Sequence, residues 1–257
     1  MQGLFHEDAA FCRFSVPVEA LAKELTFSVT DDIHPLCKIA AAELQQYLQQ
    51  QQDWTHNFGL SANGEGAVIG KMFGVLVVRN SRQELGYLAA FSGKLAGGNH
   101  HHRFVPPIFD GVADGGFLNA GMTRLTAINT EIKALEQGND NGSTEKIATL
   151  KALRKEHSIA LQRKIFDQYH FMNKTGGTKS LVDIFEQQGY RQPPAGAGEC
   201  AAPKLLQYAF HRKMEPLALA EFWWGLSPKS ATWKHGHFYA PCKEKCAAIL
   251  THMLAAN

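Results

Sequence analysis

The last quarter of the chain constrains the fold most, because it contains two predicted helix starts on either side of one apolar strand. A helix is predicted from Cys200 to Phe210, with Pro203 in its first turn, where the missing N–H costs little. The apolar segment 216–225, PLALAEFWWG, is typical of a buried strand. Pro241 then introduces a last helix over 243–254. We therefore expect a helix, a strand and a helix in succession, with cysteines at both helix starts.

An antiparallel hairpin is predicted earlier in the chain. Two apolar runs, 67–79 and 85–93, are joined by the polar turn NSRQE. Neither run alternates cleanly between apolar and polar residues, so we expect both faces of the sheet to be covered. A helix is expected after Pro35, because apolar residues recur there at helical spacing up to Leu48.

Between this hairpin and the last quarter, two apolar stripes at helical spacing are separated by the break GNDNGS (138–143). They predict an antiparallel helical hairpin over 123–173, inserted into one core domain made of 1–122 and 174–257. The predicted order indicates an α/β fold of the α+β kind, a mixed sheet covered by helices.

The composition narrows the partners and the location. The chain has 257 residues, a net charge of +2 and 45% apolar residues, which is ordinary for a globular protein and gives no strongly cationic field. No apolar run is long enough to cross a membrane, and the N-terminus has no apolar core of a signal peptide. Five cysteines, an odd number, are best explained as reduced thiols, so we expect a cytoplasmic protein without membrane contact.

Three of these cysteines are candidate metal ligands. Cys200 and Cys242 lie at helix starts, where the helix dipole favours thiolates, and Cys246 lies one turn after Cys242 on the same face. Three thiolates are suitable ligands for zinc, with a fourth position for water. The alternatives that the sequence leaves open are plain burial of the three thiols and a disulfide.

Aromatic and basic residues around the cysteines, together with a histidine-rich loop, are candidate contacts for single-stranded RNA. The predicted RNA-binding residues are Trp223, Trp224, Lys229, Trp233, Lys234, His235, His237, Lys243 and Lys245, with His100, His101 and Arg103 in the loop. The alternatives are a tryptophan pair that ends a core strand with one ring exposed, and a loop that is merely polar.

Several long segments resemble the N-terminal region of one group of bacterial RluA-type RNA pseudouridine synthases. They include GKMFGVLVV, ELGYLAAFSGKLAGGNHHHRFVPPIFD, PPAGAGECAAPKLLQYAF, LALAEFWWGLSPK and HGHFYAPCKEKCAAILTHML, and they extend from about residue 34 to residue 254. The family's catalytic Arg-Leu-Asp motif does not occur in the sequence. The resemblance therefore implies a noncatalytic RNA-binding domain that positions rRNA or tRNA for a catalytic domain, in cis or in trans.

The predicted element order is also similar to that of zinc-dependent nucleoside deaminases, which have a three-layer αβα core. That family places a catalytic Glu two residues after the first ligand and continues with Pro-Cys-x-x-Cys. Here Ala202 stands in the place of the Glu, and Cys242 and Cys246 are one residue further apart. The expectation is a degenerate deaminase-like scaffold. The open alternatives are an active zinc deaminase and a docking module that uses the helical hairpin.

Overall fold

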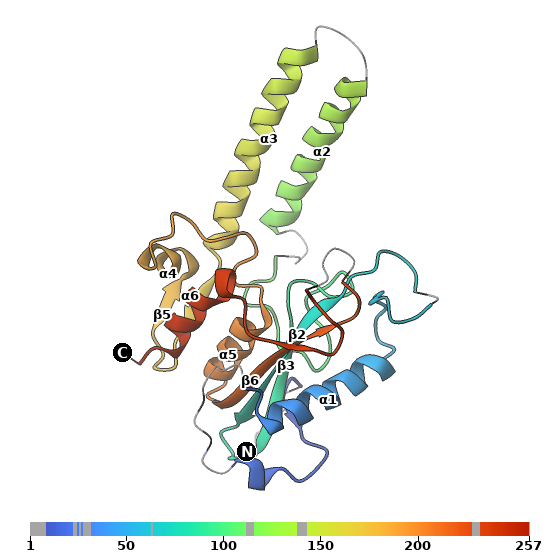
Figure 1. The fold of residues 1–257 in the computed structure, drawn as a ribbon. Helices are drawn as coiled ribbons and strands as arrows, with labels where there is room; N and C mark the ends of the chain where they lie inside the picture. Colours follow the sequence, from blue (N-terminus) through green and yellow to red (C-terminus); the bar gives the residue numbers. More distant parts are fainter. Residues whose placement is uncertain are drawn as a thin grey trace, which may run out of the picture.

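The computed structural model describes residues 9–22, 25, 27, 32–62, 64–111, 116–137, 143–227 and 232–256. Its centre is a five-stranded sheet with the order β1-β3-β2-β6-β7 (Figure 1). The strands are β1 (Cys12–Arg13), β2 (Lys71–Arg79), β3 (Leu85–Phe91), β6 (Glu215–Trp224) and β7 (Phe238–Tyr239). β2 and β3 form the hairpin that the two apolar runs predict, and β6 is the predicted strand of the last quarter.

The expectation of a mixed sheet is wrong. All pairs of named strands among the described residues are antiparallel. β3 and β6 do run in the same direction, but β2 lies between them and is antiparallel to both. The long connection from β3 to β6 therefore skips a strand position, so it creates no parallel pair.

Helices cover both faces of the sheet, as the apolar strands predict (Figure 1). α1 (Pro35–Gln50) packs on one face, and α5 (Ala201–His211) packs on the other. The α1 face buries Phe73, Val75, Val77, Tyr87 and Ala89 with Leu36, Ala40 and Leu44. The α5 face buries Leu76, Val78, Leu88 and Ala90 with Ala201, Leu205 and Leu206. Alternate residues of each strand thus enter two different cores, which explains the continuous apolar runs.

Further elements lie beyond α5. α6 (Lys243–Leu254) packs against α5 and against the short helix α4 (Leu181–Gln187). β4 (His170–Met172) and β5 (Thr178–Ser180) form a separate two-stranded sheet beside them. α5 and α6 begin where the sequence predicts, with Cys200 and Cys242 as their N-cap residues.

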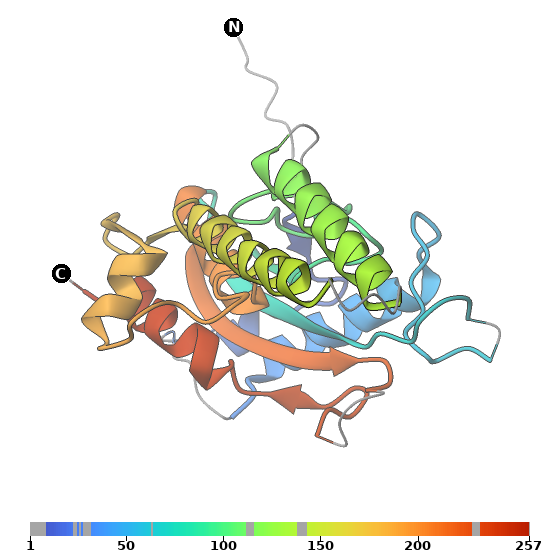
Figure 2. The same ribbon diagram turned by 90° about the horizontal axis from the view of Figure 1, so that it is seen from above.

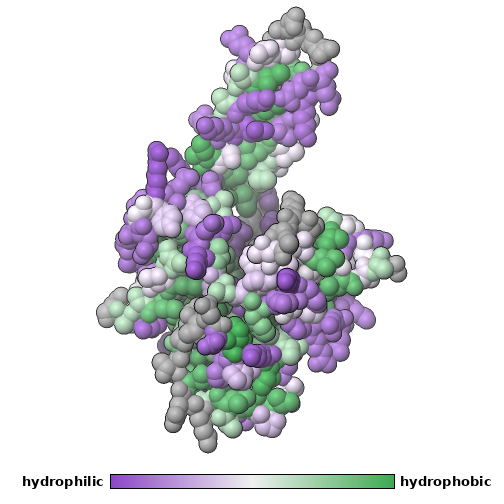
Figure 3. Space-filling model, in the orientation of Figure 1, coloured by the Kyte–Doolittle hydropathy of each residue, from purple (hydrophilic) through white to green (hydrophobic). Residues whose placement is uncertain are grey.

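Two long helices, α2 (Phe117–Gln137) and α3 (Ser143–Phe166), project from the compact part and lie side by side (Figures 1 and 2). Hydrophilic residues dominate the outer surface of the pair (Figure 3). Only Ile128 and Ile132 are buried in α2, and salt bridges Lys146–Glu131 and Lys151–Glu136 join the two helices. Within the described part of the chain, no helix is long and apolar enough to cross a membrane.

Candidate functional site: the N-terminus of α5

The N-terminus of α5 lies unusually close to the sheet, because β2 has a glycine beneath it. A Cβ atom added at Gly74 would lie 2.9 Å from the Cβ of Ala201 and 3.0 Å from Cδ1 of Leu205. Such distances leave no room for a side chain, so Gly74 permits the contact between helix and sheet. The first turn of α5 is thereby held against β2 and β6.

Glu221 of β6 lies under this helix start. It pairs with Gly74 across the sheet, and its side chain is 3% exposed. Its Oε1 accepts a hydrogen bond of 2.9 Å from the backbone N–H of Ala202. Burial raises the pKa of Glu221 to about 7, and the Ala202 hydrogen bond opposes that rise. A free N–H at a helix start and a nearby carboxylate thus satisfy each other.

Two of the three predicted metal ligands meet beside Glu221. The thiols of Cys200 and Cys246 are hydrogen-bonded to each other. This bond lowers the pKa of Cys200, while burial and Glu221 oppose the shift, and Lys245 and Lys204 add to it. The same bond, together with burial, raises the pKa of Cys246, which therefore keeps its proton and acts as the donor.

Cys242 does not join this pair, because the N-cap position of α6 leaves it exposed at the surface. All five cysteines are free thiols. In the ranges that the structure describes, no group of three or more His, Cys, Asp or Glu side chains is arranged to hold a metal ion.

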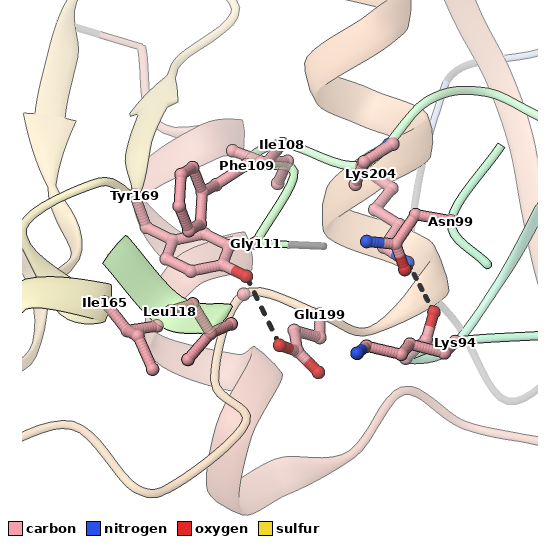
Figure 4. A pocket seen from close by; sticks show the side chains of 13 residues that line it. Lys94, Asn99, Ile108, Phe109, Gly111, Leu118, Ile165, Tyr169, Glu199 and Lys204 are labelled. Carbon is pink, nitrogen blue, oxygen red and sulfur yellow. Dashed lines mark hydrogen bonds between the residues drawn. The ribbon is translucent and has the colours of Figure 1, made fainter. Parts of the chain in front are cut away.

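A small cavity with a mainly apolar lining lies beside Glu199, the residue before Cys200 (Figure 4). Its volume is about 50 Å³, which is room for a few water molecules. The hydroxyl of Tyr169 donates to Oε1 of Glu199 over 3.4 Å. The ammonium group of Lys204 donates to the carbonyls of Phe91 (2.9 Å) and Gly93 (3.2 Å). Burial lowers the pKa of Lys204 to about 8, against the opposing effect of Glu199.

No sequence motif predicts this cavity. Its polar side chains come from the loop after β3, the segment after α3, the turn before α5 and the first turn of α5. Its apolar walls come from the loop after β3 and from α2 and α3. The cavity is lined by Gly93, Lys94, Asn99, Pro107, Ile108, Phe109, Gly111, Leu118, Ile165, Tyr169, Gly198, Glu199 and Lys204. A lysine such as Lys204, within an apolar helix face, is the one signal that sequence reading offers for a buried charge.

Three aromatic rings form a partly exposed surface at the β7 edge of the sheet. We call Trp223, Trp233 and Tyr239 the aromatic surface. The rings of Trp223 and Trp233 are stacked, with centroids 5.5 Å apart and an interplanar angle of 18°. Tyr239 meets Trp233 edge-on at 4.7 Å. Tyr239 pairs with Glu221 across the sheet, so this surface lies on the α5 face, next to the thiol pair.

Tyr239 also fixes the loop that carries the neighbouring cations. Its hydroxyl accepts from the backbone N–H of Lys234 over 2.8 Å and donates to the carbonyl of Thr232 over 3.0 Å. Most predicted cations of this region are exposed, and Lys245 is half-buried. The exposed residues are Lys234, His235, His237 and Lys243. Lys229 lies outside the described residues.

Trp224 does not belong to the surface, although it was one of the predicted RNA contacts. It is 3% exposed and packs in the core on the α1 side. Adjacent residues of a strand point to opposite faces, so Trp223 and Trp224 cannot share one. The nearby ring of His235 lies 4.3 Å from that of Trp224 and accepts a hydrogen bond from Gly225 N–H, so it supports the turn after β6.

The predicted RNA contacts in the histidine-rich loop lie at the other edge of the sheet. The loop follows β3, and Phe104 forms a bridge with Ala89 on the side where β1 pairs. His101 packs between Trp54 and Phe91 and bonds the carbonyl of Leu95. It is therefore a structural residue of the loop.

His100 is exposed and bonds Asp110 over 2.8 Å, and Arg103 is half-buried. The predicted contacts thus divide into two groups at opposite sheet edges.

Comparisons of this chain with protein-family models, curated proteins and solved structures found no match.

Proposed function

We propose that this chain is a noncatalytic RNA-binding domain that positions rRNA or tRNA for a pseudouridine synthase catalytic domain, in cis or in trans. The segments that resemble RluA-type synthases form β2, β3, α5, β6 and α6, which are the core of the fold. Five free thiols support a reducing compartment, for which we propose the cytoplasm.

The aromatic surface is the observation that carries this proposal. The rings of Trp223 and Trp233 are large and partly exposed, and each is held by stacking against the other. Bases of single-stranded RNA stack on such rings, and each stacked base contributes roughly 1–3 kcal/mol. Lys234 follows Trp233 directly, and its backbone N–H bonds the Tyr239 hydroxyl. Lys234 and Lys243 are both exposed and supply the charge that phosphates require.

Fluorescence anisotropy with a single-stranded RNA, repeated with its duplex and at graded salt, tests the proposal. Trp233→Ala should weaken binding to the single strand by roughly 1–3 kcal/mol, and Trp233→Phe should restore part of the loss. Lys234→Ala should reduce the salt dependence by about one phosphate contact. Tyr190→Ala is the matched control, since Tyr190 is a 49% exposed ring elsewhere on the surface.

Equal losses in Trp233→Ala and Tyr190→Ala would count against the aromatic surface. Affinity no higher than for an unrelated acidic polymer would remove the RNA-binding proposal altogether.

A second candidate is a zinc site of the nucleoside-deaminase kind. The elements α1, β2, β3, α5, β6 and α6 follow the order of that three-layer fold, with α2 and α3 inserted between β3 and α5. Glu221 supports this candidate, because its carboxylate bonds the N–H of Ala202, the residue that stands where that family has its Glu. Zinc would lower the pKa of a bound water molecule at such a site.

The present donor set fits zinc only in part, since Cys200 and Cys246 converge and Cys242 is exposed. A zinc site needs Cys242 to turn inward. Elemental analysis of the purified protein, with ammonia release from cytidine, adenosine and tRNA, tests the candidate. Stoichiometric zinc that is lost in Cys242→Ser would support a three-thiolate site, and zinc-free protein without turnover would reject it.

A further inference from the structure

A groove runs along one side of the projecting helices, between α2 and α3. It is bounded by 125–129 of α2 and 151–159 of α3, and its volume is about 600 Å³. We call it the arm groove. A second hollow, of about 900 Å³, continues it toward α4, since Lys155 and Ile159 line both. Together the two follow α3 from Lys151 to Phe166, a length of ~22 Å that accommodates about four turns of a helix.

Large apolar side chains at the arm groove are open to solvent. Ile159, which lines it, is 42% exposed. Met122 lies one turn before the lining residue Thr126 on the same face of α2, and it is 51% exposed. In the described part of α2 only Ile128 and Ile132 are buried, so the two helices cover their apolar residues incompletely. A third helix in the groove would bury this surface, as the helices of a small bundle do for one another.

Two cations flank Ile159 along α3. Lys155 and Arg163 each lie one turn away from it, and both are exposed. Neither forms a salt bridge or a side-chain hydrogen bond with any residue that the structure describes. The segment 117–166 contains eight lysines and arginines against five acids, a surplus of three that exceeds the net charge of +2 of the whole chain. The exposed apolar side chain therefore has uncompensated positive charge on both sides.

The remaining cations of the arm groove add to this charge. Lys151 is paired with Glu136 over 2.8 Å, but the guanidinium group of Arg154 bonds only the neutral amide oxygen of Asn129, over 2.9 Å. No aspartate or glutamate is among the described residues that line the arm groove. The second hollow has two acids, at positions 167 and 186, so the cationic character is confined to the groove between α2 and α3.

We propose that the arm groove binds an acidic amphipathic helix of a partner protein. Apolar side chains spaced i, i+3, i+4 and i+7 on such a helix would cover Ile159 and Met122, and its carboxylates would lie opposite Lys155 and Arg154. A second copy of this chain is a poorer match, because its own groove carries the same cations. RNA phosphates would satisfy the cations but would leave the apolar side chains exposed to water. The inference does not rest on RNA binding by the aromatic surface.

Fluorescence anisotropy of the full chain with a labelled peptide tests the inference. The probe is a peptide of three heptads with leucine at positions a and d and glutamate or glutamine elsewhere, and its control has lysine in place of each glutamate. We expect the acidic peptide to bind and the basic peptide not to bind. Ile159→Asp should weaken binding of the acidic peptide by about tenfold or more, because it removes the apolar contact and adds a like charge.

A charge reversal makes the test specific. Lys155→Glu should weaken binding of the acidic peptide and allow the basic peptide to bind, because the change replaces attraction by repulsion for one peptide and does the opposite for the other. Lys164→Glu is the matched control, since Lys164 is an exposed cation of α3 that does not line the groove, and it should bind both peptides as the unaltered protein does. All three substitutions are at exposed positions, and circular dichroism checks that each variant is folded.

Other occupants of the groove give different results. Absence of binding by the acidic peptide, or equal losses in Ile159→Asp and Lys164→Glu, overturns the inference. A dimer in sedimentation equilibrium that Ile159→Asp dissociates would assign the groove to a second copy and overturn it as well. So would a loss of RNA affinity in Lys155→Glu without any binding of the acidic peptide, which would assign the cations to RNA phosphates. A failure of the aromatic surface to bind RNA leaves the peptide result intact, so the two proposals fail separately.

Discussion

The carboxylate of Glu221 and the backbone N–H of Ala202 are joined by a hydrogen bond of 2.9 Å between the sheet and the first turn of α5. This bond gives a buried acid one partner, but it does not compensate for the loss of water around the charged form. The pKa of the Glu221 carboxyl group is therefore raised from its ordinary value of 4.5 to about 7. The neighbouring thiols of Cys200 and Cys246 add no positive charge to stabilise the carboxylate.

Glu221 makes stability depend on pH. Because its pKa is raised in the folded state, the unfolded chain loses this proton first as the pH rises above 4.5. Stability should fall between about pH 4.5 and pH 7 and then level off. Glu221→Gln keeps an acceptor for Ala202 N–H without a charge. At pH 8 it should exceed the unaltered protein in stability by on the order of 3 kcal/mol, and at pH 4 the difference should vanish.

Urea unfolding of both proteins across this pH range measures the effect. Glu244→Gln, an exposed acid in the first turn of α6, is the control that should leave the profile unchanged. Parallel profiles for Glu221→Gln and the unaltered protein would mean that the carboxylate is stabilised by a charge or water that the geometry lacks.

Cys200 should be more reactive than Cys246 toward iodoacetamide. The hydrogen bond from Cys246 lowers the pKa of Cys200, and the Cys200 side chain is partly exposed while Cys246 is fully buried. Cys246→Ala removes the donor and should raise the pKa of Cys200, so alkylation at pH 7 should slow. Cys246→Ser keeps a hydroxyl donor and should preserve most of the reactivity. The rates follow from mass spectrometry of the peptide around Cys200, in a Cys242→Ser background.

Gly74→Ala should separate α5 from the sheet. The added methyl group would lie 2.9 Å from Ala201 Cβ, in a part of the core where backbone atoms must move to make room. Overpacking of this kind costs about 1–3 kcal/mol. Gly98→Ala is the matched control, because its nearest contact would be an ordinary 3.6 Å. Thermal unfolding should show a clear loss for the first substitution only.

The pair of long helices, α2 and α3, contains a buried polar atom that makes no hydrogen bond to the described residues. Nε2 of His157 is buried and has no hydrogen-bond partner among the described residues. Removal of such a group, with an apolar side chain in its place, stabilises a protein by about 1 kcal/mol. His157→Leu should therefore raise the free energy of unfolding, whereas Ser158→Leu, on the exposed neighbouring position, should change it little. A gain of the same size in both variants would point to helix propensity instead.

The sequence predicts where the helices and strands begin and end better than it predicts which of their side chains come into contact. The starts of α5 and α6 follow from Pro203, Pro241 and the apolar periodicity, which act within a few residues. The choice of Cys246 rather than Cys242 as the partner of Cys200 depends on the rotation of α6 against α5. Such a rotation is set by packing between distant segments, and i, i+4 spacing alone does not fix it.

The division of the predicted RNA contacts has the same origin. His100 and Trp233 are both polar-loop residues beside aromatic runs, so the sequence treats them alike. Only strand order reveals that β1 and β7 are the two edges of one sheet. The prediction of a mixed sheet is wrong for a related reason. The long connection from β3 to β6 determines on which side of β2 the strand β6 pairs, and the local sequence does not reveal this.

α5 also sets a length scale for RNA on this domain. Its first turn lies at the thiol pair and near the aromatic surface, and its C-cap residue, Arg212, lies at the far end of the helix. Eleven residues at a rise of 1.5 Å each give a length of ~16 Å. An RNA strand that stacked on the aromatic surface and followed the helix to its far end would need roughly five stacked nucleotides to cover this length. Oligonucleotides of two or three nucleotides can occupy the aromatic surface only, so RNA affinity should stop rising once the strand is longer than the surface that it contacts.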